Sequence, residues 1–176
     1  MATLEEVLRR KQEQAAEALR ELPPIIGNEA VNFSLETFEK QAWPGNSTEV
    51  WPKRKNPTKW GKADGEHPLL QKTMKLKRSI RVTRIEEDRV WIGAGGPDIP
   101  YARVHNEGSK GYVTQKVKPY SYLRNGKKVE IKAGFERTIN QNIPKRQYIG
   151  GEKDSPYLKA RVRRVAIAHF RNKLKQ

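Results

Sequence analysis

The sequence contains no cysteine, which excludes disulfides, thiolate chemistry and cysteine zinc sites, so the histidines and carboxylates are the first side chains to consider for acid–base or metal chemistry. His67, His105 and His169 lack the H-x-x-x-H or H-E-x-x-H spacing typical of a zinc site. The acidic run 86–88 suits a polar turn better than two carboxylates that face one substrate. We interpret His105 as a packed structural residue. With no nucleophile beside a base, we expect neither an enzyme nor a bound metal or cofactor.

Anion binding is the other chemistry that the residue types suggest, since the 176 residues carry a formal net charge of +16. Basic side chains are concentrated in 41–85, 109–151 and 152–176, whereas the remaining segments are net negative. Such a field attracts polyanions or acidic surfaces over about 8–10 Å in physiological salt. The cations that we consider able to face DNA are Lys53, Arg54, Lys55, Lys59, Arg161, Arg163, Arg164 and Arg171.

Residues 41–67 mix tryptophans with prolines and cations and have no usable periodicity. In one interpretation the aromatic rings stack on bases while the cations neutralise phosphates, as in proteins that bind single strands. In the other, the segment is a loop whose tryptophans pack into the domain and whose lysines face water. We favour the second interpretation, and the family resemblance given below implies that Trp51 anchors the loop.

Composition predicts one domain, 1–176, with a small core and extended loops, because hydrophobic residues make up 35% of the chain and charged residues 32%. No apolar run approaches the roughly 20 residues that span a bilayer. Glu5 and Glu6 interrupt any secretory signal at the start. We therefore expect a soluble protein made in the cytoplasm, with no membrane partner.

Two helices are predicted within 1–40. The first has Thr3 as a candidate N-cap with Glu6 three residues later, followed by apolar residues near helical spacing. Pro23 and Pro24 are expected to end it. A second amphipathic helix then runs toward Phe38.

Segment 68–108 has the clearest strand pattern. Apolar residues alternate from Ile80 to Ile85, the acidic turn follows, and an apolar strand returns at 90–92 until the glycine–proline run 93–97 stops it. Segment 109–151 holds a second predicted hairpin, Tyr120 to Ile131, around Asn125-Gly126, the pair that best supports a type I′ turn.

The last predicted element is a helix in 152–176, capped by Asp154 or Ser155, with Pro156 in its first turn. Its basic side could be a solvated face, could line a DNA channel, or could meet an acidic neighbour. The expected fold class is α+β: N-terminal helices, a small antiparallel β-sheet with long basic loops and an inserted hairpin, and a C-terminal helix.

Several short motifs add a resemblance to these patterns. They are T-x-x-L-x-x-S-I at 73–80, Y-A-R-V-H at 101–105 and I-P-K-R-Q-Y-I-G at 143–150. With them the chain resembles the phage virion morphogenesis (tail completion) family, which includes the Mu-like G proteins. Met74 stands where that family has glycine, and Asn106-Glu107 stand where it has glutamine and an aromatic. The matching residues are Trp51, Thr73, Leu76, Ser79, Ile80, Gly93, Tyr101, Ala102, His105, Gly108, Pro144, Arg146 and Gly150.

The resemblance implies a structural virion protein, assembled in the host bacterial cytoplasm and placed at the neck or the head-proximal end of the tail. Its implied partners are further copies in a ring, commonly a hexamer, and neighbouring tail-tube, tail-terminator or head-connector proteins. Packaged DNA could lie near its basic surface. Two alternatives stay open: a scaffold or minor capsid protein, or a monomeric nucleic-acid-binding module that uses the tryptophan–lysine loop and the C-terminal helix.

Overall fold

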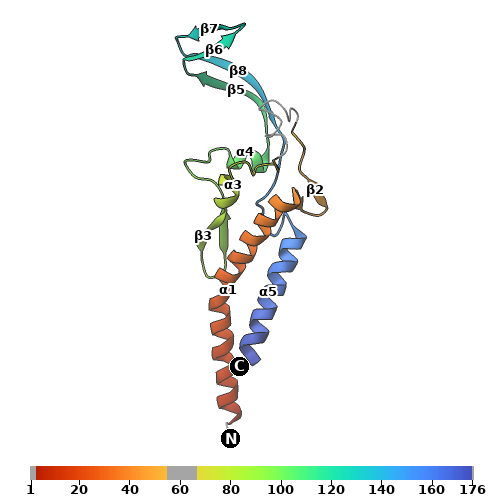
Figure 1. Cartoon of the computed structure of the whole chain (residues 1–176). Helices are drawn as coiled ribbons and strands as arrows, with labels where there is room; N and C mark the ends of the chain where they lie inside the picture. Colours follow the sequence, from red (N-terminus) through yellow and green to blue (C-terminus); the bar gives the residue numbers. More distant parts are fainter. Residues whose placement is uncertain (1–2, 55–66, 176) are drawn as a thin grey trace.

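Two long helices form the spine of the molecule (Figure 1). The structure is a computed structural model that describes residues 3–54 and 67–175. Helix α1 (Leu4–Lys40) packs beside helix α5 (Pro156–Lys175), and two short helices, α3 (Lys75–Arg78) and α4 (Ala102–Glu107), lie between them in the sequence. With antiparallel strands between the helices, the α+β class is confirmed. No helix in the described ranges is long and apolar enough to cross a membrane.

The prediction of a helix break at Pro23 and Pro24 is wrong, because α1 is continuous for 37 residues. Each proline removes a helical hydrogen bond, which normally kinks or ends a helix. Here Figure 1 shows α1 changing direction near its middle without ending. Ion pairs to α5 hold the helix on both sides of the prolines, at Glu21–Lys173 (2.8 Å) and Glu29–Arg161 (2.6 Å). Tertiary contacts therefore outweigh the local preference. The predicted Thr3–Glu6 capping box is confirmed.

Within the described residues the strands form separate antiparallel pairs rather than one sheet. The pairs are β1 (Ala42–Pro44) with β2 (Thr48–Val50), β3 (Arg81–Ile85) with β4 (Val90–Gly93), β5 (Ser109–Val117) with β8 (Phe135–Ile143), and β6 (Tyr120–Arg124) with β7 (Lys127–Ile131). The hairpins predicted at 80–92 and 120–131 are confirmed. The pair β1–β2 lies in a segment expected to be loop, because strands of three residues carry no periodicity.

The hairpin β3–β4 packs on α1 at a glycine. A Cβ at Gly27 would lie 2.8 Å from Val82 Cγ2 and 3.0 Å from Val90 Cγ1, closer than carbon atoms normally approach. The helix therefore has no side chain at the point where the hairpin touches it. This close approach fixes the position of the acidic turn 86–88 beside the first half of α1.

The arm, residues 109–143, is a longer hairpin than predicted. Strands β5 and β8 pair over nine residues each and carry β6–β7 beyond them, and the turn residues Asn125 and Gly126 both have positive φ, as a type I′ turn requires. Strands β5 and β8 could not be predicted from the sequence, because both of their faces are mostly exposed and no alternation of apolar residues marks them. Figure 1 shows the arm projecting from the end of the molecule opposite to the chain termini.

Candidate functional site: a motif junction and a projecting arm

The motif segments meet in one place, the motif junction, defined by six buried residues from five parts of the chain. Leu76 and Ile80 come from the first motif and Ala102 from the second, and Trp51 comes from the loop after β2. Phe38 from the end of α1 and Tyr148 from the third motif complete it. The three aromatic rings touch, with Phe38 at 5.3 Å from Trp51 and 5.2 Å from Tyr148 between ring centroids. Long-range burial thus joins segments that are far apart in the sequence.

Hydrogen bonds fix the third motif against the second. The backbone N–H groups of Tyr148 and Ile149 both donate to Asn106 Oδ1, at 3.0 Å each. The Tyr148 hydroxyl donates to the Ala102 carbonyl at 2.7 Å. The Arg146 N–H donates to the His105 carbonyl at 2.8 Å. Short helix α4 therefore holds segment 144–150, which follows the arm, in place through these hydrogen bonds.

Arg146 also connects this segment to the loop after β2. It is buried, and its Nε and Nη2 donate to the Pro52 carbonyl at 3.0 and 2.8 Å. Trp51, also buried, donates from Nε1 to the Gln147 carbonyl at 2.9 Å. Burial, followed by the nearby charge of Arg54, lowers the pKa of Arg146. Both side chains therefore join the loop after β2 to segment 144–150, and their burial leaves little surface for contact with a ligand.

The glycines of the motifs have steric roles. Gly108 ends α4 with φ of 78° and lies against the backbone of Lys145, where a Cβ would approach the Lys145 N atom to 2.9 Å. Gly150 lies against the ring of Trp43, where a Cβ would be 2.8 Å from Cζ2. Gly93 ends β4, and a Cβ there would lie 2.8 Å from Thr83 Cγ2. Glycine at these positions therefore allows close approach of backbone, a ring and a side chain, respectively.

The remaining motif residues lie at the edge of the junction. Ser79 Oγ accepts from the Gly95 N–H at 2.9 Å and donates to the Leu76 carbonyl at 2.7 Å. Tyr101 is 38% exposed and packs edge-on against His105. Thr73 is exposed and Pro144 is half-buried.

His105 is half-buried beside the third motif. Burial, and then the charge of Arg146, lower its pKa, and its Nδ1 has no hydrogen-bond partner in the described part of the chain. No group of three or more His, Cys, Asp or Glu residues that could hold a metal occurs in the described ranges. The arrangement around His105 thus offers packing and backbone contact.

Three residues of the junction region escaped sequence reasoning. The sequence pattern marks Phe38 only as the place toward which a predicted helix runs, and Tyr148 only as one position of the motif at 143–150. Asn106 stood as a departure from the family pattern, yet its amide oxygen holds two backbone N–H groups. A short polar side chain just before a helix-ending glycine was the signal that could have found it.

The candidate DNA-facing cations separate into different environments. Lys53 is exposed, whereas Arg54 donates to the His67 and Pro68 carbonyls at 2.7 and 3.2 Å. Lys55 and Lys59 lie outside the described residues. Arg163, Arg164 and Arg171 are exposed on α5.

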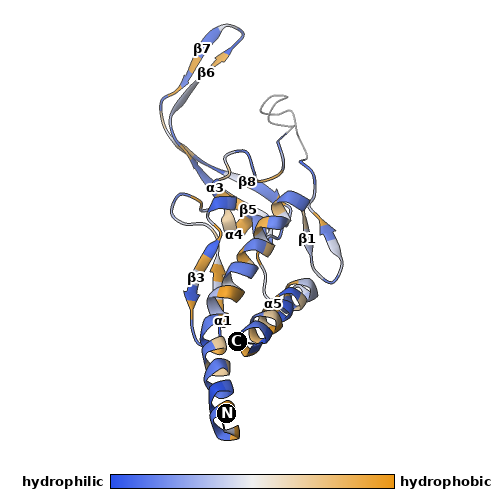
Figure 2. Ribbon diagram, turned by 60° about the horizontal axis from the view of Figure 1, so that its bottom comes forward, coloured by the Kyte–Doolittle hydropathy of each residue, from blue (hydrophilic) through white to orange (hydrophobic). Residues whose placement is uncertain are grey.

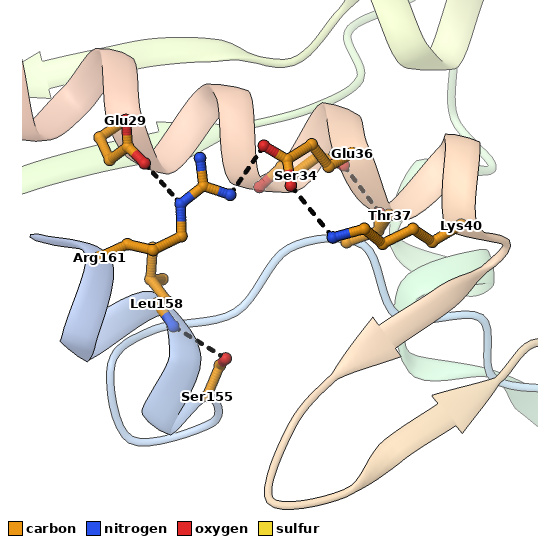
Figure 3. Close-up of polar contacts among 8 residues, drawn as sticks. All are labelled: Glu29, Ser34, Glu36, Thr37, Lys40, Ser155, Leu158 and Arg161. Atoms are coloured by element: carbon orange, nitrogen blue, oxygen red, sulfur yellow. Dashed lines mark hydrogen bonds and ion pairs between the residues drawn. The ribbon is translucent and has the colours of Figure 1, made fainter.

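Arg161 differs from the other α5 arginines because it lies between the helices (Figure 3). Its Nε pairs with Glu29 at 2.6 Å and its Nη1 with Glu36 at 2.7 Å, both on α1. Its guanidinium also lies 5.7 Å from the Phe33 ring centroid. Of the two predicted caps of α5, Asp154 and Ser155, the structure has Ser155, whose Oγ accepts from the Leu158 N–H at 3.1 Å. Arg161 thus helps to join α5 to α1.

The arm presents large apolar side chains that its own chain leaves uncovered. Figure 2 shows hydrophobic residues along it, away from the helices. On β6–β7, cross-strand partners Tyr120 and Ile131 share one face with Tyr122 and Val129, and the two tyrosine rings stack at 5.9 Å. A two-stranded hairpin is marginally stable in water. The other exposed apolar residues of the arm are Tyr112, Val113, Leu123 and Phe135.

Comparison with known proteins agrees with this arrangement of motifs. The model of the phage virion morphogenesis family matches residues 1–169, almost the whole chain. No curated protein and no solved structure is similar enough to match. The family match includes every residue of the motif junction, which is where separate motifs of the sequence come together. The chain belongs to the phage virion morphogenesis family.

Proposed function

We propose that this protein is a structural component of the phage virion that forms a ring, commonly sixfold, at the head-proximal end of the tail or at the head–tail junction. Family membership supports a role in virion morphogenesis. In this proposal the motif junction gives each subunit a rigid centre, and the projecting arm reaches neighbouring subunits. Neighbouring tail-tube, tail-terminator or head-connector proteins contact the two sides of the ring.

The observation that carries the proposal is the arm. A nine-residue strand pair with a second hairpin beyond it projects away from the helices, and several of its aromatic and aliphatic side chains are exposed (Figure 1). Exposed apolar surface of this kind marks a protein–protein contact. A contact with further copies fits a small subunit that must build a closed assembly, because one copied interface is enough to generate a ring.

The test is the mass in solution, measured by light scattering for the full chain at low and high salt. A discrete oligomer near six times 20.3 kDa supports the ring. Removing the apolar tip side chains with Tyr120→Ser and Tyr122→Ser should lower the mass toward that of one chain. The pair Arg163→Ser and Arg164→Ser, on α5, is the matched control. A wild-type monomer at all concentrations and salts would contradict a self-assembling ring.

One observation favours the second candidate, a monomeric nucleic-acid-binding module. Lys159, Arg163 and Arg171 follow along one side of α5 at spacings of four and eight residues, where they border a shallow cavity with Ile167. Phosphate contacts make affinity fall steeply with salt. A monomer that binds short duplex DNA with a steep salt dependence, lost in Arg163→Ser and Arg171→Ser, would favour this candidate over the ring.

A further inference from the structure

An apolar groove lies between the middle of α1, the turn and second strand of β3–β4, the segment 149–152 and the start of α5. Its volume is about 490 Å³. Leu19, a groove residue on α1, is 58% exposed. The β3–β4 hairpin forms one wall, and its contact at Gly27 keeps that wall in place. Apolar side chains from all of these segments line it, among them Leu22, Ile26, Trp91, Ile149 and Val162.

The charged groups that border this groove are mainly acidic. Glu87, Asp88 and Glu152 line it, together with Arg89. Arg89 pairs with Asp88 at 3.3 Å, which leaves Glu87 and Glu152 without an ion-pair partner among the residues that the structure describes. An occupant with an apolar face and basic edges would therefore match both the groove and its rim.

The tip of the arm has this composition. Its tip face, Tyr120, Tyr122, Val129 and Ile131, is apolar. Beside it Arg124 and Lys127 lie directly opposite each other, and like charges at such a position destabilise a hairpin unless an anion is near. Segment 109–143 as a whole carries eight basic and two acidic residues. Both of its carboxylates are paired within the arm, as Lys116–Glu136 and Lys128–Glu130.

The tip cannot occupy the groove of its own chain. Figure 1 shows the arm leaving the body at the end away from the turn of β3–β4. Measured along the chain, the path from Ser109 to the turn is roughly 50 Å at about 3.3 Å per residue. Figure 1 shows the arm bending where β6–β7 follows β5–β8, so the tip lies closer to the body than this length, yet well outside it and open to a neighbouring molecule.

We propose that the tip face of one subunit docks into the apolar groove of the next copy, with Arg124 and Lys127 against Glu87 and Glu152. The inference rests on the proposed ring and names the two surfaces that would build it. The two surfaces are different, so the contact is head-to-tail, and repeating it closes a ring when the rotation between subunits allows.

Cysteine coupling tests this contact, because the chain has no cysteine of its own. Full-length Leu123→Cys, on the far face of the tip, is mixed with mass-tagged Arg89→Cys at the groove and treated with a short thiol-to-thiol crosslinker. The matched control replaces Arg89→Cys by Val50→Cys, which is 74% exposed on β2 outside the groove. We expect the groove pair to couple at least five times faster than the control pair.

The outcomes separate the two proposals. Selective coupling supports the docking, and it does so even if light scattering shows only short, open oligomers. A discrete oligomer whose groove and control pairs couple equally would overturn the docking and leave the ring intact. A monomer with equal coupling of both pairs would overturn the docking and the ring together.

A charge exchange gives an independent readout. Variant A carries Arg124→Glu and Lys127→Glu, and variant B carries Glu87→Lys and Glu152→Lys, so that each alone has like charges on both docking surfaces. We expect each variant alone to lose assembly and an equimolar mixture to regain it. In the mixture the acidic tip of variant A meets the basic groove of variant B, and the basic tip of variant B meets the acidic groove of variant A. Arg163→Glu with Arg164→Glu is the control for altered net charge. A mixture that stays as dissociated as its components would overturn the docking.

Discussion

The hydroxyl of Tyr148 donates a 2.7 Å hydrogen bond to the carbonyl of Ala102, 46 positions earlier in the chain. The bond joins the third motif to the second inside the motif junction, where both residues are buried. Burial, followed by the neighbouring Tyr101, raises the pKa of Tyr148 far above its ordinary value. The phenol therefore stays neutral and keeps its proton for this bond.

Tyr148→Phe should lower the free energy of unfolding by about 1 kcal/mol at pH 7, the usual net worth of a buried hydrogen bond. The effect should shrink above pH 10. The pKa of Tyr148 is raised in the folded state, so the phenol ionises near its ordinary 10.0 in the unfolded chain but not in the folded one. Wild type therefore loses this contribution to stability as pH rises past that value, whereas the phenylalanine variant has no such contribution to lose. Urea unfolding of wild type and Tyr148→Phe at about pH 7 and 10.5 measures the difference in free energy of unfolding at each pH. An equal difference at the two pH values would contradict a raised pKa of Tyr148 in the folded state.

Met74 is a second candidate for a simple substitution, because it lies at φ of 57° just before α3. The left-handed region costs an L-residue roughly 1–2 kcal/mol, whereas glycine adopts it freely. Met74→Gly should therefore raise the free energy of unfolding by roughly 0.5 kcal/mol, after the entropy that glycine loses on folding. Thermal unfolding is the measurement. Lys75→Gly, one residue later inside α3, is the control and should cost about 1 kcal/mol.

Met74 also shows what the sequence could predict. Local signals identified the capping box at Thr3, the Asn125-Gly126 turn and the Ser155 cap, because each depends on neighbouring residues only. The resemblance marked Met74 as the place of a family glycine, and the backbone there adopts the conformation that glycine favours. Short-range patterns of this kind indicated whether a segment is helix or strand through most of the chain.

The features that escaped prediction depend on distant contacts. Nothing near Pro23 indicates that ion pairs to α5 will carry α1 through two prolines. Arg161 looked like its neighbours Arg163 and Arg164 until α1 placed Glu29 and Glu36 beside it. Strand β5 has no alternation because its own chain buries neither face, so only pairing with β8 reveals it.

Because of His105, the free energy of unfolding should fall as the pH is lowered into the mildly acidic range. Burial and Arg146 lower its folded pKa below the ordinary 6.5. Below pH 6.5 the unfolded chain therefore binds a proton that the folded chain does not, and folding is disfavoured progressively as pH falls. His105→Gln, which cannot titrate, should show a smaller drop in urea midpoint between about pH 7.5 and 5.5. An equal drop in both proteins would show that the histidine is not responsible.

Gly27→Ala tests the contact that holds one wall of the groove. Alanine favours a helix by about 1 kcal/mol over glycine, so in a solvent-facing helix the change would stabilise. Here the new Cβ would lie 2.8 Å from Val82 Cγ2, and overpacking costs roughly 1–3 kcal/mol. We expect net destabilisation by about 1 kcal/mol, measured by urea unfolding.

A double-mutant cycle with Val82→Ala separates the clash from the helix propensity. Removing the valine methyls should make Gly27→Ala less costly by at least about 0.5 kcal/mol, the coupling that touching residues show. If Gly27→Ala stabilised the protein in both backgrounds, the hairpin β3–β4 would not rest on α1. The turn that carries Glu87 would then have no fixed place beside Leu19, and the groove that we propose for the arm would lose one wall.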